Sequence, residues 1–367
     1  MNSIRSFLTI SVVVALLLPI SMGIVASYAD ADTTVDSSTD GFISYYDQLD
    51  DNEKAVYDAL QNFDANVLTV TVTLPYPIYI SVGSSLKDTE TYLYGVVDGF
   101  LDDAFYVLQL SDPLAICTWG DSKLTYDHNY LTSGDTIGYT TMEITAHIDP
   151  AYADDVDTTD VNELQKKIDA VNDALDSFTT SGTTRDKVGS INKYVLDTAI
   201  YDPNAGTDKE SPYAHDIYGV LVASDHYAVC NGYSKTILAL CEKYDIDCIM
   251  IYGYAVPSME AHAWNYIKMD NGSWYALDST WNDAASNAYF LVGIDTFMAE
   301  HQAGLQPSTG ATLALDYPVL ADTKYDADPW YDADIYPMIV AAAIVIIIIG
   351  IVSTGIFIKV INGENNL

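Results

Sequence analysis

Along residues 41–155, segments with the hydrophobic spacing of a helix alternate with segments with the hydrophobic spacing of a strand. Apolar side chains at a spacing of about 3.6 residues mark one face of a helix, whereas strict alternation marks a half-buried strand. The helical spacing occurs at residues 45–63 and 92–110, and the strand alternation occurs at 67–82, 122–130 and 136–148, with Pro75 and Pro77 interrupting the first strand. The pattern predicts a small mixed α/β domain over residues 41–155.

A second group of elements follows over residues 156–325. Asp160 with Glu163 three residues later is the pattern of a helix start. Asp270-Asn271-Gly272 between two apolar runs is a strong hairpin signal. Helices are expected at 160–178, 184–199 and 230–244, and strands at 249–256 and on both sides of the hairpin turn. We expect an α+β domain in which the last of these helices packs on an antiparallel sheet.

Both ends of the chain carry apolar runs. The first begins after Arg5 and ends in small residues before an acidic segment, which is the three-part pattern of a secretory signal, cleaved or retained as an anchor. The second is almost unbroken over residues 338–358, and about twenty such residues span a bilayer. The expected segments are a signal peptide (1–29), a disordered spacer (30–40), an acidic stalk (326–337), a transmembrane helix (338–358) and a cytoplasmic tail (359–367). The predicted location is the cell membrane, in a single pass, with both domains extracellular.

The net charge of the chain limits the classes of molecule that it can bind. Its 367 residues include 52 acidic and 15 basic residues, with a net charge of −37. Such a field repels phosphate backbones and disfavours nucleic acid as a partner. We interpret the acidity as a solvating surface suited to salty surroundings. Calcium sites are the alternative, but the aspartate cluster at 154–160 lacks the glycine and terminal glutamate of an EF-hand loop. No cofactor is indicated, and no zinc-ligand spacing occurs.

Four cysteines in a chain placed outside the cell do not form a disulfide framework. Cys230 stands at the start of the predicted helix 230–244. Unpaired backbone N–H groups and the macrodipole favour an anion there, so Cys230 is a candidate thiolate nucleophile. A lone cysteine opening a helix is more often a buried apolar side chain, so this interpretation requires a base nearby. Cys241 and Cys248 are interpreted as buried apolar side chains.

His262 and Asp278 lie on the two strands of the predicted hairpin. A two-residue loop at Asn271-Gly272 would place Asp278 on the face that excludes His262. A three-residue loop, with Gly272 in the left-handed position, pairs Asp278 with Trp264 and puts both of them on the face of His262. We predict the second register, in which His262 is the base and Asp278 fixes its tautomer.

Other readings of these residues stay open. His226, four residues before Cys230, is the rival base, although no carboxylate faces it on a neighbouring strand. A single histidine such as His262 is also typical of a half-buried strand. Trp264, Trp281 and Tyr233 are candidates for binding substrate or shielding the site from water, although tryptophans in a hairpin more often belong to the core.

In these motifs the chain resembles the transglutaminase-like superfamily. The family's cysteine, one residue, then Gly-Tyr appears as Cys230-Asn-Gly232-Tyr233. Its His-x-Trp appears as His262-Ala-Trp264, and its Trp-x-x-x-Asp with a following Thr-Trp appears as Trp274-Tyr-Ala-Leu-Asp278-Ser-Thr-Trp281. The resemblance covers residues 162–322, because the later Tyr289 and His301 also look like prokaryotic members. Three ordered motifs are far more specific than one.

The resemblance implies a papain-like core and attack by Cys230 on an amide carbonyl. His262 would act as base and then acid, Asp278 would orient it, and a thioester would form. Members include protein crosslinkers, proteases and deglycosylating amidases, and some have lost activity. We expect a membrane-anchored cysteine enzyme acting on peptides or proteins at the cell surface, with hydrolysis favoured over crosslinking. The alternative is a non-catalytic surface module that binds its ligand in the same aromatic-lined cleft. The insertion at 215–226 departs from compact members and leaves the oxyanion-hole partner unassigned.

Overall fold

The computed structural model describes residues 42–82, 86–127, 130–153, 161–285, 287–304, 311 and 313–326. The chain divides into two compact units, Met1–Lys324 and Tyr325–Leu367, and every helix and strand below belongs to the first. The predicted signal peptide, spacer, transmembrane helix, tail and nearly all of the stalk lie outside the described residues, as does the aspartate cluster at 154–160. In the described part of the chain, no helix is long and apolar enough to span a membrane.

The N-terminal sheet is antiparallel. Its strands are β1 (Thr69–Ser81), β2 (Lys123–Tyr126), β3 (Leu131–Ser133) and β4 (Thr136–His147), in the order β1-β4-β2 with β3 also paired to β4. The β1–β4 register shifts between Thr73 and Ile78, around Pro75 and Pro77. Proline has no N–H to donate to the neighbouring strand. The interruption predicted at these prolines is therefore present as a shift in register, and β1 continues on both sides of it.

Three helices accompany this sheet: α1 (Tyr45–Gln48), α2 (Asp51–Leu60) and α3 (Leu86–Ser111), with a short 3-10 turn, η1 (Ile116–Thr118), after α3. The single helix predicted at 45–63 is therefore two helices. Leu49 is extended, and Asp50 caps α2 by accepting from the Glu53 N–H while the Glu53 carboxylate accepts from the Asp50 N–H. This reciprocal cap favours a new helix start at Asp50 over continuation of α1.

The second half begins with helices α4 (Val161–Ser177), α5 (Thr184–Thr198), α6 (Ile217–Leu221) and α7 (Cys230–Lys243). A short parallel pair, β5 (Ile200–Tyr201) with β6 (Tyr227–Ala228), brings the chain to the start of α7. This pair was not predicted, because two-residue strands carry no periodic signal.

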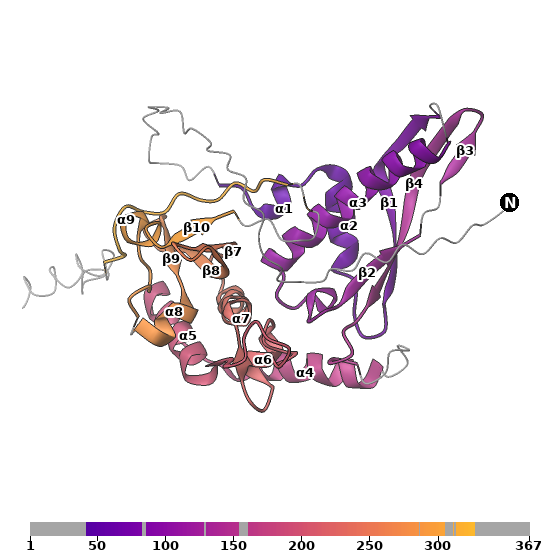
Figure 1. Cartoon of the computed structure of the whole chain (residues 1–367). Coiled ribbons are helices and arrows are strands. Elements are labelled where there is room, and N and C mark those ends of the chain that lie inside the picture. Colours follow the sequence, from indigo (N-terminus) through magenta and orange to yellow (C-terminus); the bar gives the residue numbers. More distant parts are fainter. Residues whose placement is uncertain are drawn as a thin grey trace, which may run out of the picture. The chain divides into compact units, whose positions relative to one another are not determined.

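An antiparallel sheet completes the unit. Its strands are β7 (Cys248–Ala255), β8 (Glu260–Lys268), β9 (Trp274–Leu277) and β10 (His301–Ala303), in the order β10-β7-β8-β9. Two short helices, α8 (Ser279–Ala285) and α9 (Ile294–Phe297), lie between β9 and β10 in sequence. Helix α7 packs against β7 and β8, as Figure 1 shows. The predicted packing of this helix on an antiparallel sheet is confirmed.

Buried polar contacts join the residues before 155 to those after it. The Tyr45 hydroxyl donates to the Met250 carbonyl at 3.1 Å, and the Tyr106 ring stacks on that of Tyr252 with centroids 6.4 Å apart. Lys235 of α7 forms an ion pair of 2.5 Å with Asp216, and both side chains are almost fully buried. Asp216 also accepts from the Gly120 N–H and from the Tyr152 hydroxyl, at 2.6 and 2.9 Å. The region expected as a separate N-terminal domain thus contacts the helix that begins at Cys230.

Candidate active site

Cys230 is the first residue of α7, and the Val229 side chain makes no capping hydrogen bond. The N–H groups of a first turn have no partner within their helix, so they remain available to an anion beside the sulfur. The Cys230 thiol is partly exposed, and its nearest polar partner on the same helix is Asn231 Oδ1, at 3.7 Å. Gly232 permits this turn to pack closely, because a Cβ there would lie 2.7 Å from the Ala214 carbonyl oxygen.

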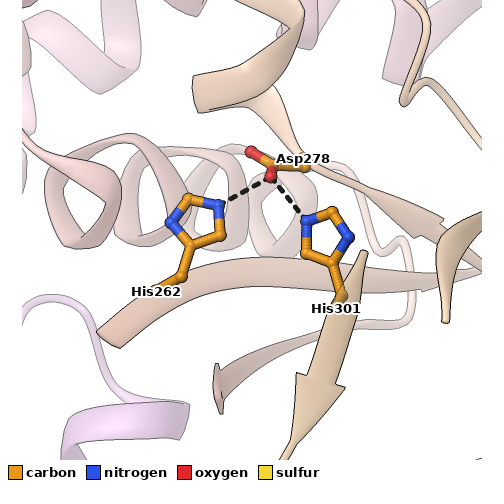
Figure 2. Close-up of side chains that lie close together, drawn as sticks. All are labelled: His262, Asp278 and His301. Atoms are coloured by element: carbon orange, nitrogen blue, oxygen red, sulfur yellow. Dashed lines mark hydrogen bonds and ion pairs between the residues drawn. The ribbon is translucent and has the colours of Figure 1, made fainter. Parts of the chain in front are cut away.

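His262 of β8 and Asp278 at the end of β9 face one another across the hairpin. The pairs Asn265 with Leu277 and Lys268 with Trp274 define the register, and Gly272 has a φ of +80°. A three-residue loop is therefore present, and the predicted register is confirmed. His262 Nε2 lies 2.7 Å from Asp278 Oδ2. Figure 2 shows the imidazole directed at this carboxylate.

Cys230 also influences His262. Nε2 of His262 faces Asp278, and the Cys230 side chain is near enough to contribute to the raised pKa of His262. Burial of the ring lowers the pKa of His262, but the hydrogen bonds and charges of Asp278 and Cys230 outweigh it and raise this pKa to about 10. The structure therefore pairs His262 with Asp278 and places Cys230 near enough to influence the imidazole.

The Asp278 carboxylate is fully buried and fully paired. Its Oδ1 accepts from the Trp281 N–H at 2.9 Å, and its Oδ2 accepts from His262 and from His301 Nε2, the latter at 3.0 Å. Burial raises the pKa of Asp278, yet the hydrogen bonds from the two histidines and from the Trp281 N–H hold it below its ordinary value. Asp278 thus carries its negative charge within the protein interior.

His301 also contacts Asp278, although the sequence motifs did not assign it a role. It has no exposed surface and approaches Asp278 from β10, the edge strand on the far side of β7 from β8. Figure 2 shows the His262 and His301 rings both directed at the same carboxylate. The only sequence signal was its place in the segment after Tyr289 that also resembles prokaryotic members of the family.

The other histidines lie elsewhere. The rival base His226 uses Nδ1 to bind the Val220 carbonyl at 2.7 Å, and its backbone has a positive φ of 52°. His215 pairs with Glu210 at 2.8 Å, and His147 with Thr125 at the same distance. His128 lies outside the described residues.

The three aromatic candidates differ in exposure. Trp281 is half-buried and stacks on the His262 ring, with centroids 5.3 Å apart and planes at 25°. Trp264 and Tyr233 are fully buried, and the Tyr233 hydroxyl donates to Asp283 of α8 at 3.0 Å. Trp281 is therefore placed to shield the imidazole, whereas the predicted contacts of Trp264 and Tyr233 with substrate stay predictions.

One group of potential metal ligands occurs in the described part of the chain. His262, Asp278 and His301 each offer one ligand atom, and these atoms lie within 4.8 Å of one another. Two imidazoles and a carboxylate are ligands that suit zinc. The same atoms also satisfy one another through hydrogen bonds, so the group is complete without an ion.

Part of the chain matches a known protein family. Residues 170–279 match the family described as the transglutaminase-like superfamily. This part of the chain is therefore a transglutaminase-like domain, and it contains Cys230, His262 and Asp278. The superfamily is one of cysteine acyltransferases and proteases. No curated protein matches the chain.

Solved structures overlap the chain only in part. A crystal structure of a transglutaminase is 18% identical, covers 41% of this chain and 43% of its own, and has a TM-score of 0.29. A candidate cysteine protease from Cytophaga hutchinsonii is 16% identical over 58% of this chain and 82% of its own, with a TM-score of 0.25. The periplasmic domain of TgpA from Pseudomonas aeruginosa is 11% identical over 46% of this chain and 76% of its own, with a TM-score of 0.23. The assignment rests on the family match, not on these overlaps.

Proposed function

We propose that this protein is a cell-surface cysteine enzyme acting on amide bonds of peptides or proteins, with hydrolysis favoured over crosslinking. Cys230 is the nucleophile, His262 the base and then the acid, and Asp278 the residue that orients His262. The observation that supports the proposal is the position of His262, which hydrogen bonds to Asp278 at 2.7 Å and has its pKa raised by both Asp278 and Cys230. This is the order of groups that thiol acyl transfer requires.

The first step moves a proton from the Cys230 sulfur to His262 Nδ1. The resulting imidazolium is stabilised by Asp278, in agreement with the raised pKa of His262. The thiolate lies at the start of α7, where the macrodipole and the free N–H groups favour negative charge. The pair is thus ready to react before substrate arrives.

The thiolate then attacks the amide carbonyl carbon, and a C–S bond forms as the carbonyl oxygen takes the negative charge. The first-turn N–H groups of α7 are donors of fixed direction for that oxygen. His262 gives its proton to the amide nitrogen, the C–N bond breaks and the amine leaves. The acyl group stays on Cys230 as a thioester.

Water resolves the thioester in the favoured reaction. His262 takes a proton from the water as it attacks, and it returns that proton to the sulfur when the C–S bond breaks. An amine in place of water would give a new amide and therefore a crosslink. Cys230 is partly exposed while Asp278 has no exposed surface, so substrate reaches the sulfur and not the carboxylate.

The proposed location follows from the sequence. The signal pattern at 1–29 and the apolar run at 338–358 would anchor the chain in the cell membrane with the transglutaminase-like domain outside. Peptides and proteins of the cell surface are then the accessible substrates. The strongly negative charge favours substrates that are neutral or basic near the bond attacked.

Mass spectrometry of a surface-protein mixture tests the proposal. The full-length protein and its Cys230→Ala variant are each incubated with the mixture, and new amino termini and new isopeptide links are counted. New termini that require Cys230 establish hydrolysis, whereas new links that require Cys230 establish crosslinking. Identical products from both proteins would contradict the enzyme, and the alternative of a non-catalytic surface module would remain.

A further inference from the structure

The proposed mechanism leaves one buried histidine without a role. His301 places Nε2 3.0 Å from Asp278 Oδ2, the same oxygen that accepts from His262 at 2.7 Å. A titratable side chain with no exposed surface requires hydrogen-bond partners for its polar atoms. His301 has them at both ring nitrogens, since Nδ1 lies 3.2 Å from the Phe297 carbonyl oxygen.

Aromatic rings fix the plane of His301. Its ring stacks on Phe297 with centroids 3.8 Å apart and planes at 11°, and Trp281 covers it with centroids 4.3 Å apart. Trp264 meets it edge-on at 5.0 Å. A ring held in this way cannot turn its nitrogens away from Asp278 without disrupting the surrounding packing.

The direction of the hydrogen bonds follows from the partners. A carboxylate and a backbone carbonyl only accept, so the nitrogen that faces each of them must carry a hydrogen to make the bond. The bond to Asp278 therefore requires the Nε2–H form of His301, and the doubly protonated ring would satisfy both partners.

Asp278 is thereby held at three points. The Trp281 N–H occupies Oδ1 at 2.9 Å, and the two histidines occupy Oδ2 from different strands. Rotation of the carboxylate toward another partner would break the bond from His301 at once. A carboxylate that orients a catalytic imidazole acts only while its own direction is fixed.

We propose that His301 is a positioning residue that fixes the Asp278 carboxylate in the direction from which it orients His262. The unit is then Cys230–His262–Asp278–His301, with His301 acting through Asp278 and touching no substrate. This inference rests on the proposed thiol chemistry of Cys230. Its test must therefore distinguish a His301 that has no effect on Asp278 from a Cys230 that is not reactive.

The test compares two substitutions in the full-length protein. His301→Phe keeps a ring between Phe297 and Trp281 but removes both donors, whereas His301→Gln keeps an N–H donor for Asp278. The readout is the rate of Cys230 alkylation by iodoacetamide between pH 5 and 9, mapped by peptide mass spectrometry. We expect His301→Phe to slow alkylation at pH 7 by about 10- to 100-fold, the loss expected for one hydrogen bond to a charged group.

The pH profile separates positioning from simple stability. With His301→Phe, Asp278 supports the His262 imidazolium less well, so the rise of alkylation with pH moves to higher pH. His301→Gln restores most of the rate and of the pH midpoint. A stable His301→Phe protein with the wild-type pH midpoint would overturn the role of His301, even if its thermal stability were lower. Slow, unselective alkylation of Cys230 in the wild type would instead overturn the proposed function.

Two further measurements apply to the wild-type protein, so the inference stays testable if His301→Phe does not fold. Nitrogen-15 histidine spectra should show a proton on Nε2 of His301 that Asp278→Asn shifts, and a bare Nε2 would contradict the proposal. Treatment with a chelator should leave the alkylation rate unchanged. Loss of the rate with chelator and recovery with zinc would assign His262, Asp278 and His301 to a metal centre instead.

Discussion

His262 Nε2 donates to Asp278 Oδ2 at 2.7 Å, and the two side chains are 8% and 0% exposed. An ion pair this deeply buried is screened little by solvent, so the charge of one partner strongly favours the charge of the other. The pKa of His262 is accordingly raised to about 10 and that of Asp278 is lowered. The protonated state of His262 and the negative charge of Asp278 therefore stabilise each other.

Asp278→Asn should keep the shape of the site and remove its charge. An amide in that position also allows the wrong tautomer of His262, so we expect turnover to fall about 10³- to 10⁴-fold. The measurement is the rate of product formation on a peptide identified by the mass-spectrometric assay. Asp197→Asn, which removes a carboxylate from an exposed ion pair with Lys193 outside the triad, is the matched control and should retain activity within roughly tenfold. Equal losses in the two variants would contradict the role of Asp278.

Stability should fall at alkaline pH because of His262. A folded-state pKa raised from 6.5 to about 10 means that the folded protein binds a proton more tightly than the unfolded chain. The stabilisation is complete below pH 6.5 and is lost as the pH rises through about 10. Urea unfolding from pH 6 to 10, compared between wild type and His262→Gln, measures it. If the difference between the two proteins stays constant over that range, the raised pKa is wrong.

Asp278 contributes the opposite dependence at acid pH. Its folded-state pKa lies below the ordinary value of 3.8, so its stabilisation is present above that value and is lost as the pH falls through the folded-state pKa. Asp278→Asn should therefore flatten the acid limb of the unfolding curve. The same urea titrations, extended to lower pH, provide the test.

The buried ion pair between Lys235 and Asp216 should contribute strongly to the coupling of α7 with the N-terminal region. Removing one member leaves a buried charge without its partner, so we expect Lys235→Met to cost about 3 to 5 kcal/mol. The exposed pair Lys193 with Asp197 has the same 2.5 Å separation, and Lys193→Met should cost at most about 1 kcal/mol. Urea unfolding of both variants makes the comparison. Similar losses would show that burial of the Lys235 pair has no special consequence.

Replacement of Gly253 should destabilise the protein, although its φ does not require glycine. A Cβ at this position would lie 2.2 Å from the Gln302 carbonyl oxygen and 2.3 Å from the Trp264 ring. Gly253→Ala would displace β10, which carries His301, and we expect a loss of about 1 to 3 kcal/mol together with slower Cys230 alkylation. Gly95→Ala in α3 is the control, since no atom lies within 4 Å of the added carbon and a helix gains about 0.5 to 1 kcal/mol from alanine. If Gly253→Ala changes neither the stability nor the rate of Cys230 alkylation, β10 can move without affecting the site, and the prediction is wrong.

Local patterns predicted much of the site. The Asp270-Asn271-Gly272 turn defined the register that puts His262 and Asp278 on one face, because a hairpin loop and a side-chain period of two leave few choices. The helical spacing after Cys230 likewise predicted a sulfur at the start of α7. These features depend on residues close together in sequence.

Features that depend on distant residues were missed. His301 begins a three-residue strand that pairs with β7 out of sequence order, and its bond to Asp278 spans 23 positions. No periodic signal marks so short a strand. The contacts of Asp216 with Gly120 and Tyr152 were also not predictable, since they bring together segments 96 and 64 residues apart. Such contacts are determined by tertiary packing and not by local preference.

Selective alkylation of Cys230 tests the central claim most directly. Burial raises the pKa of the Cys117 thiol, which makes it a slow internal reference in the same protein, and the fully buried Cys241 is a second. With limiting iodoacetamide at pH 7, we expect Cys230 to react first, and His262→Ala to abolish that preference. Labelling of Cys230 no faster than Cys241, or a preference unchanged by His262→Ala, would contradict the thiolate–imidazolium pair.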